Sequence, residues 1–270
     1  MSIFETLLYP LTWILNHTIY YVFQGLAWLI CQILPFKYTM IFNEFMGIFW
    51  NGIVKTLYLA FFGTIFGLLL ACVLGVVRTI KIKKHDHILI KIIKYTTNKL
   101  ITIYVTFFRG TPMIVQSMII YYAFYKLIGW KPFDAAMVTV TINTCAYLTE
   151  VIRSSIESVD PGQMEAARSL GFSYPKSLFL VVFPQALKNA MASIGNEFII
   201  NIKDTSVLNV IGCMEMYAAL SMASGRYGFF LETMIAGSLI YLLLTYSLTK
   251  LLNFVERKLD APVKDLSSCN

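Results

Sequence analysis

Four polar side chains lie at helical spacing inside an apolar segment that covers residues 135–152. They are separated by four, four and three residues, so a helix would present all of them on one face: Thr139, Asn143, Tyr147 and Glu150. Hydroxyl and amide groups can hydrogen-bond a zwitterion that is losing its water, and a carboxylate can bind an ammonium group. The stripe therefore predicts a water-filled path. Two alternatives stay open, because the stripe could tie neighbouring helices together and Glu150 could pair with Arg153.

A second polar concentration occupies residues 196–206. Seven polar side chains fall within these eleven residues, namely Asn196, Glu197, Asn201, Lys203, Asp204, Thr205 and Ser206. They cannot face lipid, so this segment must be buried against protein or line a cavity, with local unwinding as an option. A structural hinge is an equal alternative. Gln116, one turn into another apolar segment, either lines the same path or bonds a neighbouring helix.

No constellation in the sequence fits catalysis. A nucleotide-binding loop needs a lysine and a hydroxyl residue after its second glycine, but Ile53 and Val54 follow Gly47 and Gly52. The three histidines lack the spacing of a zinc enzyme. The five cysteines form no C-x-x-C pair and are expected to be packing residues or free thiols. We therefore expect no catalytic residue, no metal and no cofactor in this chain.

The elements that hold these residues are strongly apolar. The chain is 57% hydrophobic and 14% charged, with a mean hydropathy of +0.67, which predicts an all-α integral membrane protein. Stretches of about 20 apolar residues predict six spans. These spans cover residues 11–34, 53–77, 112–128, 135–152, 190–211 and 229–252. For the first, a helix on the membrane surface is the alternative. In the second, Gly63, Gly67 and Gly75 favour close helix packing.

Residues 85–108 are not predicted to span the membrane. Lys91, Lys94 and Lys99 recur among apolar residues at roughly helical intervals, as in a helix that lies on the membrane surface with its lysines reaching water. Thr111 and Pro112 then begin the next span. This arrangement leaves Arg109 among the phospholipid headgroups, as an interface anchor or a loop tie, with direct contact with substrate as the alternative.

The net charge of +7 is distributed by side rather than as a patch for nucleic acid. The connections 78–99, 153–188 and 250–270 hold fifteen lysines and arginines, whereas 36–51, 126–134 and 213–228 hold four. Because positive charge marks the cytoplasmic face, we expect both termini and residues 160–184 to be cytoplasmic in a multi-pass inner-membrane protein.

Residues 160–184 form a polar segment with two helix-start signals. Asp160, Pro161 and Gln163 fit a capping box, Gly171 can end the first helix, and Ser173 with Pro175 can begin a second, which Pro184 interrupts. Two helices this short need something to pack on them. The segment therefore predicts a docking site for a soluble partner, with an ordinary capped loop as the alternative.

The same segment resembles the EAA loop of permease subunits of binding-protein-dependent ABC importers. The likeness rests on Glu165, Ala166 and Ala167, then Gly171 three residues on, and residues 181–184 nine residues later, where Val181 and Phe183 replace the usual Ile and Leu. Further likeness, to the branch for polar amino acids, extends over about residues 47–258. It includes Arg109 to Pro112, Gln116, Ala146, Tyr147, Glu150, Arg153, Gly162, Gln163, Pro184 to Ala186 and Lys203 to Ser206.

The resemblance implies a type I ABC importer transmembrane domain over residues 46–260, with a five-span core. Residues 1–45 would be an N-terminal extension with an extra span, and 261–270 a cytoplasmic tail. The coupling residues would be Gln163, Glu165, Ala166, Ala167, Gly171 and Pro184, docked on ATPase subunits that use ATP and Mg. Lys203, Asp204, Thr205 and Ser206 would lie near the substrate path.

The expected partners are cytoplasmic ABC ATPase subunits, an extracytoplasmic solute-binding protein, a second permease copy or paralogue, and membrane lipid. The cargo would be a polar or cationic amino acid, the latter because of Glu150. Three alternatives stay open. The chain could be a permease of this class for another small solute, a carrier or channel driven by an ion gradient, or a membrane scaffold.

Overall fold

A computed structural model describes residues 36–80, 82 and 86–260. The predicted span at residues 11–34, the tail at 261–270 and most of the extension at 1–45 lie outside the described residues. Every regular element in the described part is helical, as predicted.

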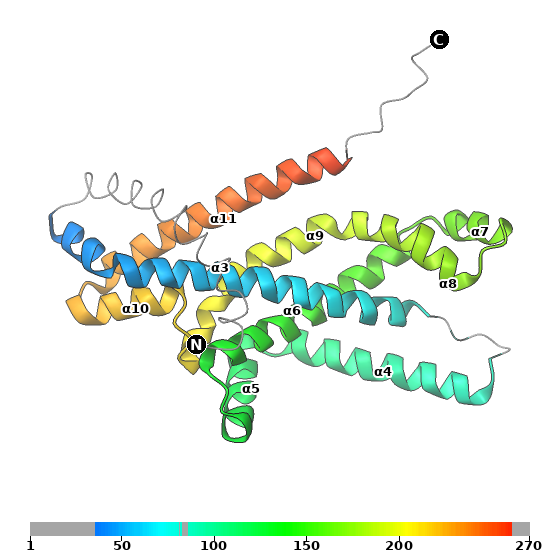
Figure 1. Cartoon of the computed structure of the whole chain (residues 1–270), viewed down its shortest axis with the longest axis horizontal. Helices are drawn as coiled ribbons and strands as arrows, with labels where there is room; N and C mark the ends of the chain where they lie inside the picture. Colours follow the sequence, from blue (N-terminus) through cyan, green and yellow to red (C-terminus); the bar gives the residue numbers. More distant parts are fainter. Residues whose placement is uncertain (1–35, 81, 83–85, 261–270) are drawn as a thin grey trace, which may run out of the picture.

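Five long helices run along the same direction. They are α3 (Phe36–Thr79), α4 (Ile88–Gly110), α6 (Pro132–Glu157), α9 (Phe183–Asp204) and α11 (Phe230–Asp260). Shorter elements join them: α5 (Met113–Ile128), α7 (Pro161–Ser169), α8 (Tyr174–Ser177), the π-helical turn η1 (Leu178–Val182), the 3-10 helix η2 (Thr205–Ile211) and α10 (Met216–Tyr227). Figure 1 shows α7 and α8 at one end of the bundle, hereafter the hairpin end, and α10 at the other, the α10 end.

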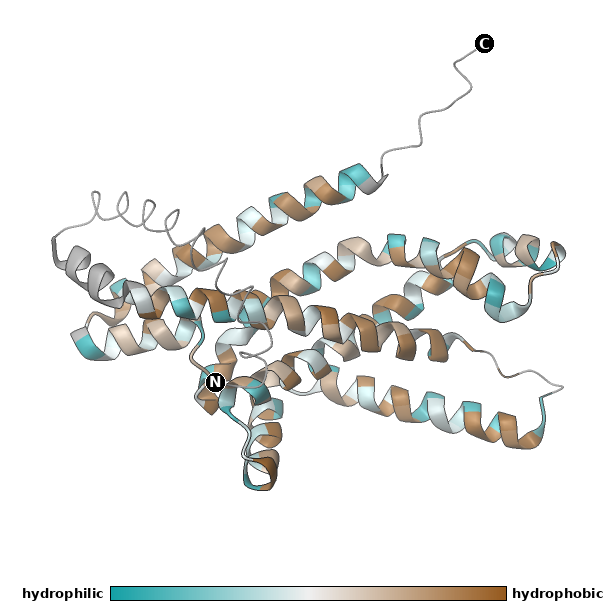
Figure 2. Ribbon diagram, in the orientation of Figure 1, coloured by the Kyte–Doolittle hydropathy of each residue, from teal (hydrophilic) through white to brown (hydrophobic). Residues whose placement is uncertain are grey.

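Four helical stretches are long and apolar enough to cross a membrane, which confirms four of the predicted spans. They are Gly47–Thr79, Pro132–Glu157, Tyr174–Ile211 and Phe230–Lys258. Figure 2 shows apolar residues along much of α3, α4 and α11, with hydrophilic residues at the hairpin end.

The prediction for residues 85–128 is wrong in its assignment of the two helices. The helix predicted to lie on the surface, α4, runs along the bundle, and α5, predicted to span, is bent from it by 112°. The three lysines lie in the first half of α4, whereas its second half packs on α6 through Ile101 and Val105. With its 16 residues, α5 is about 24 Å long, too short for a bilayer core of about 30 Å.

The core forms where α3 and α6 pack closely, as the predicted glycines require. A methyl group on Gly63 would lie 2.5 Å from Cγ1 of Val140, and one on Gly75 would lie 2.7 Å from Cγ2 of Ile152. Neither position has room for a side chain, so the two backbones lie nearly in contact. The packed helices α3 and α6 therefore hold the polar residues of α6 in fixed positions.

Candidate functional site

The predicted polar stripe on α6 is divided between the chain interior and its surface. Thr139 is fully buried, and its hydroxyl donates to the carbonyl of Ala135 over 2.7 Å. Asn143 is also buried, whereas Tyr147 is 36% exposed and Glu150 is partly exposed. The four residues do not form one open face, so only the half of the stripe toward the hairpin end can meet a solute.

Asn143 and Gln116 form a tie where α4 stops and α5 turns away. The Asn143 amide donates to Gln116 Oε1 over 2.9 Å. The Gln116 amide donates to the carbonyls of Phe108 and Thr111, each over 2.9 Å. Where a helix ends in an apolar environment, its last backbone carbonyls need hydrogen-bond donors from side chains. Both side chains therefore hold the break together inside the chain, and we name them the break tie.

Asn201 joins three helices in a second buried cluster, the three-helix tie. Its amide nitrogen donates to the hydroxyls of Thr64 on α3 and Thr144 on α6, each over 2.9 Å. All three side chains are at least 95% buried. Because the tie links α3, α6 and α9, it fixes the height of the polar segment that follows on α9.

Glu150 is held by two arginines. Arg153, the partner foreseen from the sequence, donates its Nε to Glu150 Oε1 over 3.0 Å, and Arg78 of α3 forms a second ion pair. Arg153 also pairs with Glu157. The carboxylate is thus compensated within the chain, which removes the observation that favoured it as a receptor for an ammonium group.

Charged and aromatic side chains of α4, α6 and α9 lie near one another. We call Arg109, Tyr147, Glu197 and Asp204 the open group. Arg109 lies over the ring of Tyr147, with its guanidinium carbon 5.3 Å from the ring centroid, a distance typical of a cation–π contact. Arg109 and Asp204 are also close enough to Glu197 to act on its charge. The predicted anchor Arg109 therefore lies against the path-side residues of α6 and α9. The sequence analysis noted Glu197 for its polarity but did not predict it near the substrate path.

The polar end of α9 changes helix type, but it winds more tightly instead of unwinding. After Asp204 the chain tightens into η2, which ends at Gly212 in the left-handed region at φ 80°. Thr205 is buried, and its hydroxyl donates to the carbonyl of Ile202 over 3.0 Å. Lys203 and Asp204 are exposed, and Ser206 is partly exposed.

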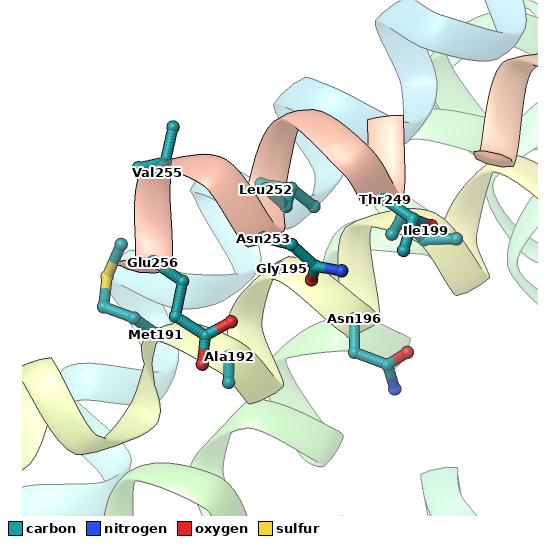
Figure 3. Close-up of a pocket in the computed structure, with 10 residues that line it drawn as sticks. All are labelled: Met191, Ala192, Gly195, Asn196, Ile199, Thr249, Leu252, Asn253, Val255 and Glu256. Carbon is teal, nitrogen blue, oxygen red and sulfur yellow. The ribbon is translucent and has the colours of Figure 1, made fainter. Parts of the chain in front are cut away.

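Exposed polar residues of α9 lie on one face of the helix, hereafter the polar stripe of α9. Its polar members are Gln185, Asn189, Asn196 and Lys203, which recur at intervals of four, seven and seven residues and are all exposed. Beside it, a pocket of about 110 Å³ opens between α9 and α11 (Figure 3). Most of its lining is apolar, with Asn196, Thr249, Asn253 and Glu256 as its polar members. The exposed polar side chains of α9 cannot face lipid.

The segment at residues 160–184 is a hairpin, although its second arm differs from the prediction. Asp160 caps α7 by accepting from the N–H of Gly162 over 2.8 Å. Gly171 turns the chain at φ 87°. The predicted capping box is not completed, because the Gln163 side chain instead accepts from the amide of Gln185 over 3.3 Å.

Pro184 does not interrupt the second arm, contrary to the prediction. The N–H of Phe183 donates to the carbonyl of Leu178, five residues back, so α8 continues through η1 into α9. A π-helical turn lets a proline enter a helix without a break, because it opens the spacing to the preceding carbonyl. The hairpin is therefore fixed to a membrane-length helix, and its tip carries Leu170 (80% exposed), Phe172 (41% exposed) and an exposed Glu165.

Comparisons with known proteins agree with this geometry. Residues 93–261 match the family model "Binding-protein-dependent transport system inner membrane component". The chain is 39% identical over 158 residues to the arginine transport system permease protein ArtQ of Bacillus subtilis, covering 58% of this chain and 72% of that one. It is 33% identical to the probable amino-acid ABC transporter permease protein PatM of Vibrio harveyi, covering 80% and 94%. It is 32% identical to the glutamine transport system permease protein GlnP of Escherichia coli, covering 77% and 91%.

Two solved structures resemble the fold. An amino acid ABC transporter crystallised with histidines matches with a TM-score of 0.68 and 32% identity, over 80% of this chain and 96% of that one. The MetNI methionine ABC transporter in an inward-facing conformation matches with a TM-score of 0.68 at 18% identity, which supports the fold alone.

Proposed function

This chain belongs to the family of binding-protein-dependent transport system inner membrane components and is a multi-pass permease of an amino-acid ABC importer, and from that premise we propose how its parts divide the work. The hairpin of residues 160–184 docks on an ATPase and moves when the ATPase changes conformation. The open group around Arg109 and Tyr147 offers a path to the amino acid. The α10 end receives the solute-binding protein.

The hairpin is the docking site of a cytoplasmic ABC ATPase. Leu170 and Phe172 expose apolar surface at a tip that the rest of the described chain does not cover. Alanines and a capped first turn keep α7 rigid. Because α8 continues through η1 into α9, a displacement of the hairpin also moves α9. The coupling residues are those of the sequence motif: Gln163, Glu165, Ala166, Ala167, Gly171 and Pro184. Accordingly, the hairpin end and both termini are cytoplasmic, and ATP with Mg is bound by the partner.

The substrate path follows the open group and the polar stripe of α9. Arg109 can bind a carboxylate, and Glu197 and Asp204 can bind an ammonium group, so together they suit a zwitterion. Tyr147, Lys203 and Ser206 border the same surface, whereas Gln116, Thr139, Asn143 and Thr205 support it from inside. The observation that carries this proposal is an exposed set of charges between helices of membrane length.

A second permease copy or a paralogue covers the polar stripe of α9. Asn196 and Lys203 are exposed on a helix that runs within the apolar bundle, and bare lipid would leave them without hydrogen-bond partners. The path then runs between two permeases, and alternating access follows when the ATPases move both hairpins.

The substrate is a polar amino acid. The names of similar permeases include arginine, glutamine and cystine, which share the zwitterionic backbone but differ in side-chain charge. A preference for cationic cargo through Glu150 is no longer supported, because Arg78 and Arg153 already compensate that carboxylate. A carrier driven by an ion gradient remains the second candidate, since Glu197 and Asp204 could bind a proton or ion.

Reconstitution with and without partners tests this proposal. The chain is placed in liposomes together with an ATPase and a binding protein from the same gene cluster, and entry of labelled arginine or glutamine is followed. Entry that needs ATP and stops in the Arg109→Ala variant supports the proposal. Entry that follows a proton gradient without ATP overturns it in favour of the carrier.

A further inference from the structure

Helix α5 stands across the bundle instead of along it. It is bent by 112° from α4, and in Figure 1 it projects sideways from the long helices. One edge is fixed to the chain, because Met113, Tyr121 and Trp130 pack against a core cluster that contains Phe133 and Leu208. Since α6 begins at Pro132 and η2 ends at Ile211, this attachment lies toward the α10 end.

The rest of α5 is open. Only Gln116 and Ser117 are buried, both in its first turns. The exposed large side chains are 39% to 75% accessible and include Val115, Met118, Ile119, Tyr122, Phe124, Tyr125, Leu127 and Ile128. Such a contiguous apolar surface needs a partner.

The chemistry of this surface indicates which partner. Two exposed tyrosines, Tyr122 and Tyr125, carry phenol groups, Lys126 adds a cation, and the helix has no carboxylate. Tyrosine and tryptophan are enriched where a bilayer meets water, because one end of the ring is apolar and the other is hydrated. A lysine there can extend to phosphate while its stem stays in the acyl region.

A second protein surface suits these groups less well. Burial against another chain would remove water from exposed phenols and from Lys126, each of which would then need its own partner. At a lipid headgroup they keep water and gain phosphate oxygens.

We infer that α5 lies in the plane of the membrane surface at the α10 end, with the phospholipid headgroup region as its partner. Its apolar residues rest on the acyl chains, its phenols and Lys126 reach the headgroups, and its axis keeps a constant depth. The break tie, which begins at the same helix, is thereby held at a fixed height in the bilayer.

Spin labels measure that depth directly. Single cysteines are introduced at Ile119, Ala123 and Leu127 in a variant that lacks the five native cysteines. These three exposed positions follow at intervals of four residues and so share one face. Nitroxide accessibility to oxygen and to a water-soluble nickel complex is measured in vesicles of phosphatidylethanolamine and phosphatidylglycerol. Labels at Leu231, Leu239 and Leu242 of α11, all exposed, are the matched spanning control.

The expected result is one shallow depth for all three α5 labels, with differences below about 3 Å, while the α11 labels change depth steadily. A spanning α5 would separate Ile119 from Leu127 by about 12 Å along the normal, which contradicts the inference. Labels that neither oxygen nor nickel reaches would indicate cover by a second copy. Labels as accessible to nickel as in water would place α5 outside the bilayer. Either of these last two outcomes overturns the inference.

Discussion

The three-helix tie and the hairpin differ in whether their side chains find partners inside the chain. The Asn201 amide donates hydrogen bonds to Thr64 and Thr144, and the side chain is almost completely buried. On the hairpin, Leu170, Phe172 and Glu165 are exposed, and the bonds that exist, such as Gln185 to Gln163, are few. Hydrogen bonds closed inside the chain stabilise it, whereas groups left open are available for a partner.

This difference separates stability from transport in experiments. A change in the three-helix tie is expected to lower stability, and to reduce transport only as far as less folded protein remains. A change at the hairpin tip is expected to remove transport from a chain that is as stable as before.

The largest expected effect is at the tip of the hairpin. Leu170→Asp places a charge on the apolar surface that we propose packs on the ATPase, so ATP-driven uptake should fall more than about tenfold. The thermal midpoint of the purified chain should not change, because this side chain is 80% exposed. The measurements are uptake in liposomes and thermal unfolding in detergent.

The control for this variant is Leu170→Met, which keeps an apolar side chain of similar size and should retain uptake. If Leu170→Asp transports normally, the tip is not the docking surface. If it unfolds at a lower temperature, the hairpin is part of the stabilising core and the comparison fails.

Glu215 tests whether a closed polar site remains stabilising when it can ionise. This residue caps α10, with its carboxylate accepting from the N–H groups of Tyr217 and Ala218, each over 2.7 Å. Burial raises the pKa of Glu215 to about 7, although these hydrogen bonds act in the opposite direction. Because the folded state holds the proton more tightly than the unfolded state, its contribution is full below about pH 4.5 and is lost as pH rises through 7.

Stability should therefore fall by about 1 to 3 kcal/mol from this group between pH 5 and pH 8. Thermal unfolding across that range measures it. Glu215→Gln keeps an oxygen for the cap and should flatten the pH dependence, whereas Glu157→Gln on the exposed end of α6 should leave it unchanged. An equally steep profile in Glu215→Gln would assign the dependence to other groups.

Much of the helical framework follows from local sequence. Long apolar windows predicted α3, α6, α9 and α11, and the spaced glycines of α3 predicted its close contact with α6. These features depend on residues within one helix. The prediction failed for α4, because Lys91, Lys94 and Lys99 lie in its first half, whereas its second half is largely apolar and packs on α6.

Partners distant in sequence were not predictable in the same way. Arg153 lies three residues from Glu150 and was foreseen, whereas Arg78 lies 72 residues away and depends on how α3 packs. Likewise, hydrogen bonds of Gln116 and Asn143 were recognised as possible, but only the bend after α4 shows which carbonyls they satisfy. Pro184 was interpreted by its usual effect on a helix, and the π-helical turn that accommodates it has no signal in the sequence.

The three-helix tie gives the next effect in size. Asn201→Ala removes the amide that donates to Thr64 and Thr144 and leaves both hydroxyls to find other partners within buried helices. We expect a loss of about 1 to 2 kcal/mol, since each hydrogen bond in a membrane bundle contributes modestly. Thermal unfolding in detergent is the measurement, and uptake per folded molecule should stay near normal.

Asn253→Ala is the matched control, because this asparagine is exposed on α11 and should change stability little. A loss of transport without a loss of stability in Asn201→Ala would place this residue in the path and would reverse its assignment to the closed group.

The smallest effect is expected at Glu150, which lies between the two kinds of site. Its carboxylate is partly exposed, yet Arg78 and Arg153 both pair with it. Because partly exposed ion pairs contribute little, Glu150→Gln should cost less than about 1 kcal/mol in thermal unfolding. The ratio of arginine to glutamine uptake should stay unchanged, since an already compensated charge cannot select a cation.

Asp204→Asn is the informative contrast, because Asp204 is exposed beside Lys203 and belongs to the proposed path. It should lower uptake of arginine more than uptake of glutamine, measured with both labelled amino acids in the same vesicles. If Glu150→Gln changed that ratio and Asp204→Asn did not, Glu150 would be the residue that selects cationic cargo, despite its pairing with Arg78 and Arg153. Openness to solvent would then no longer distinguish transport residues from structural ones.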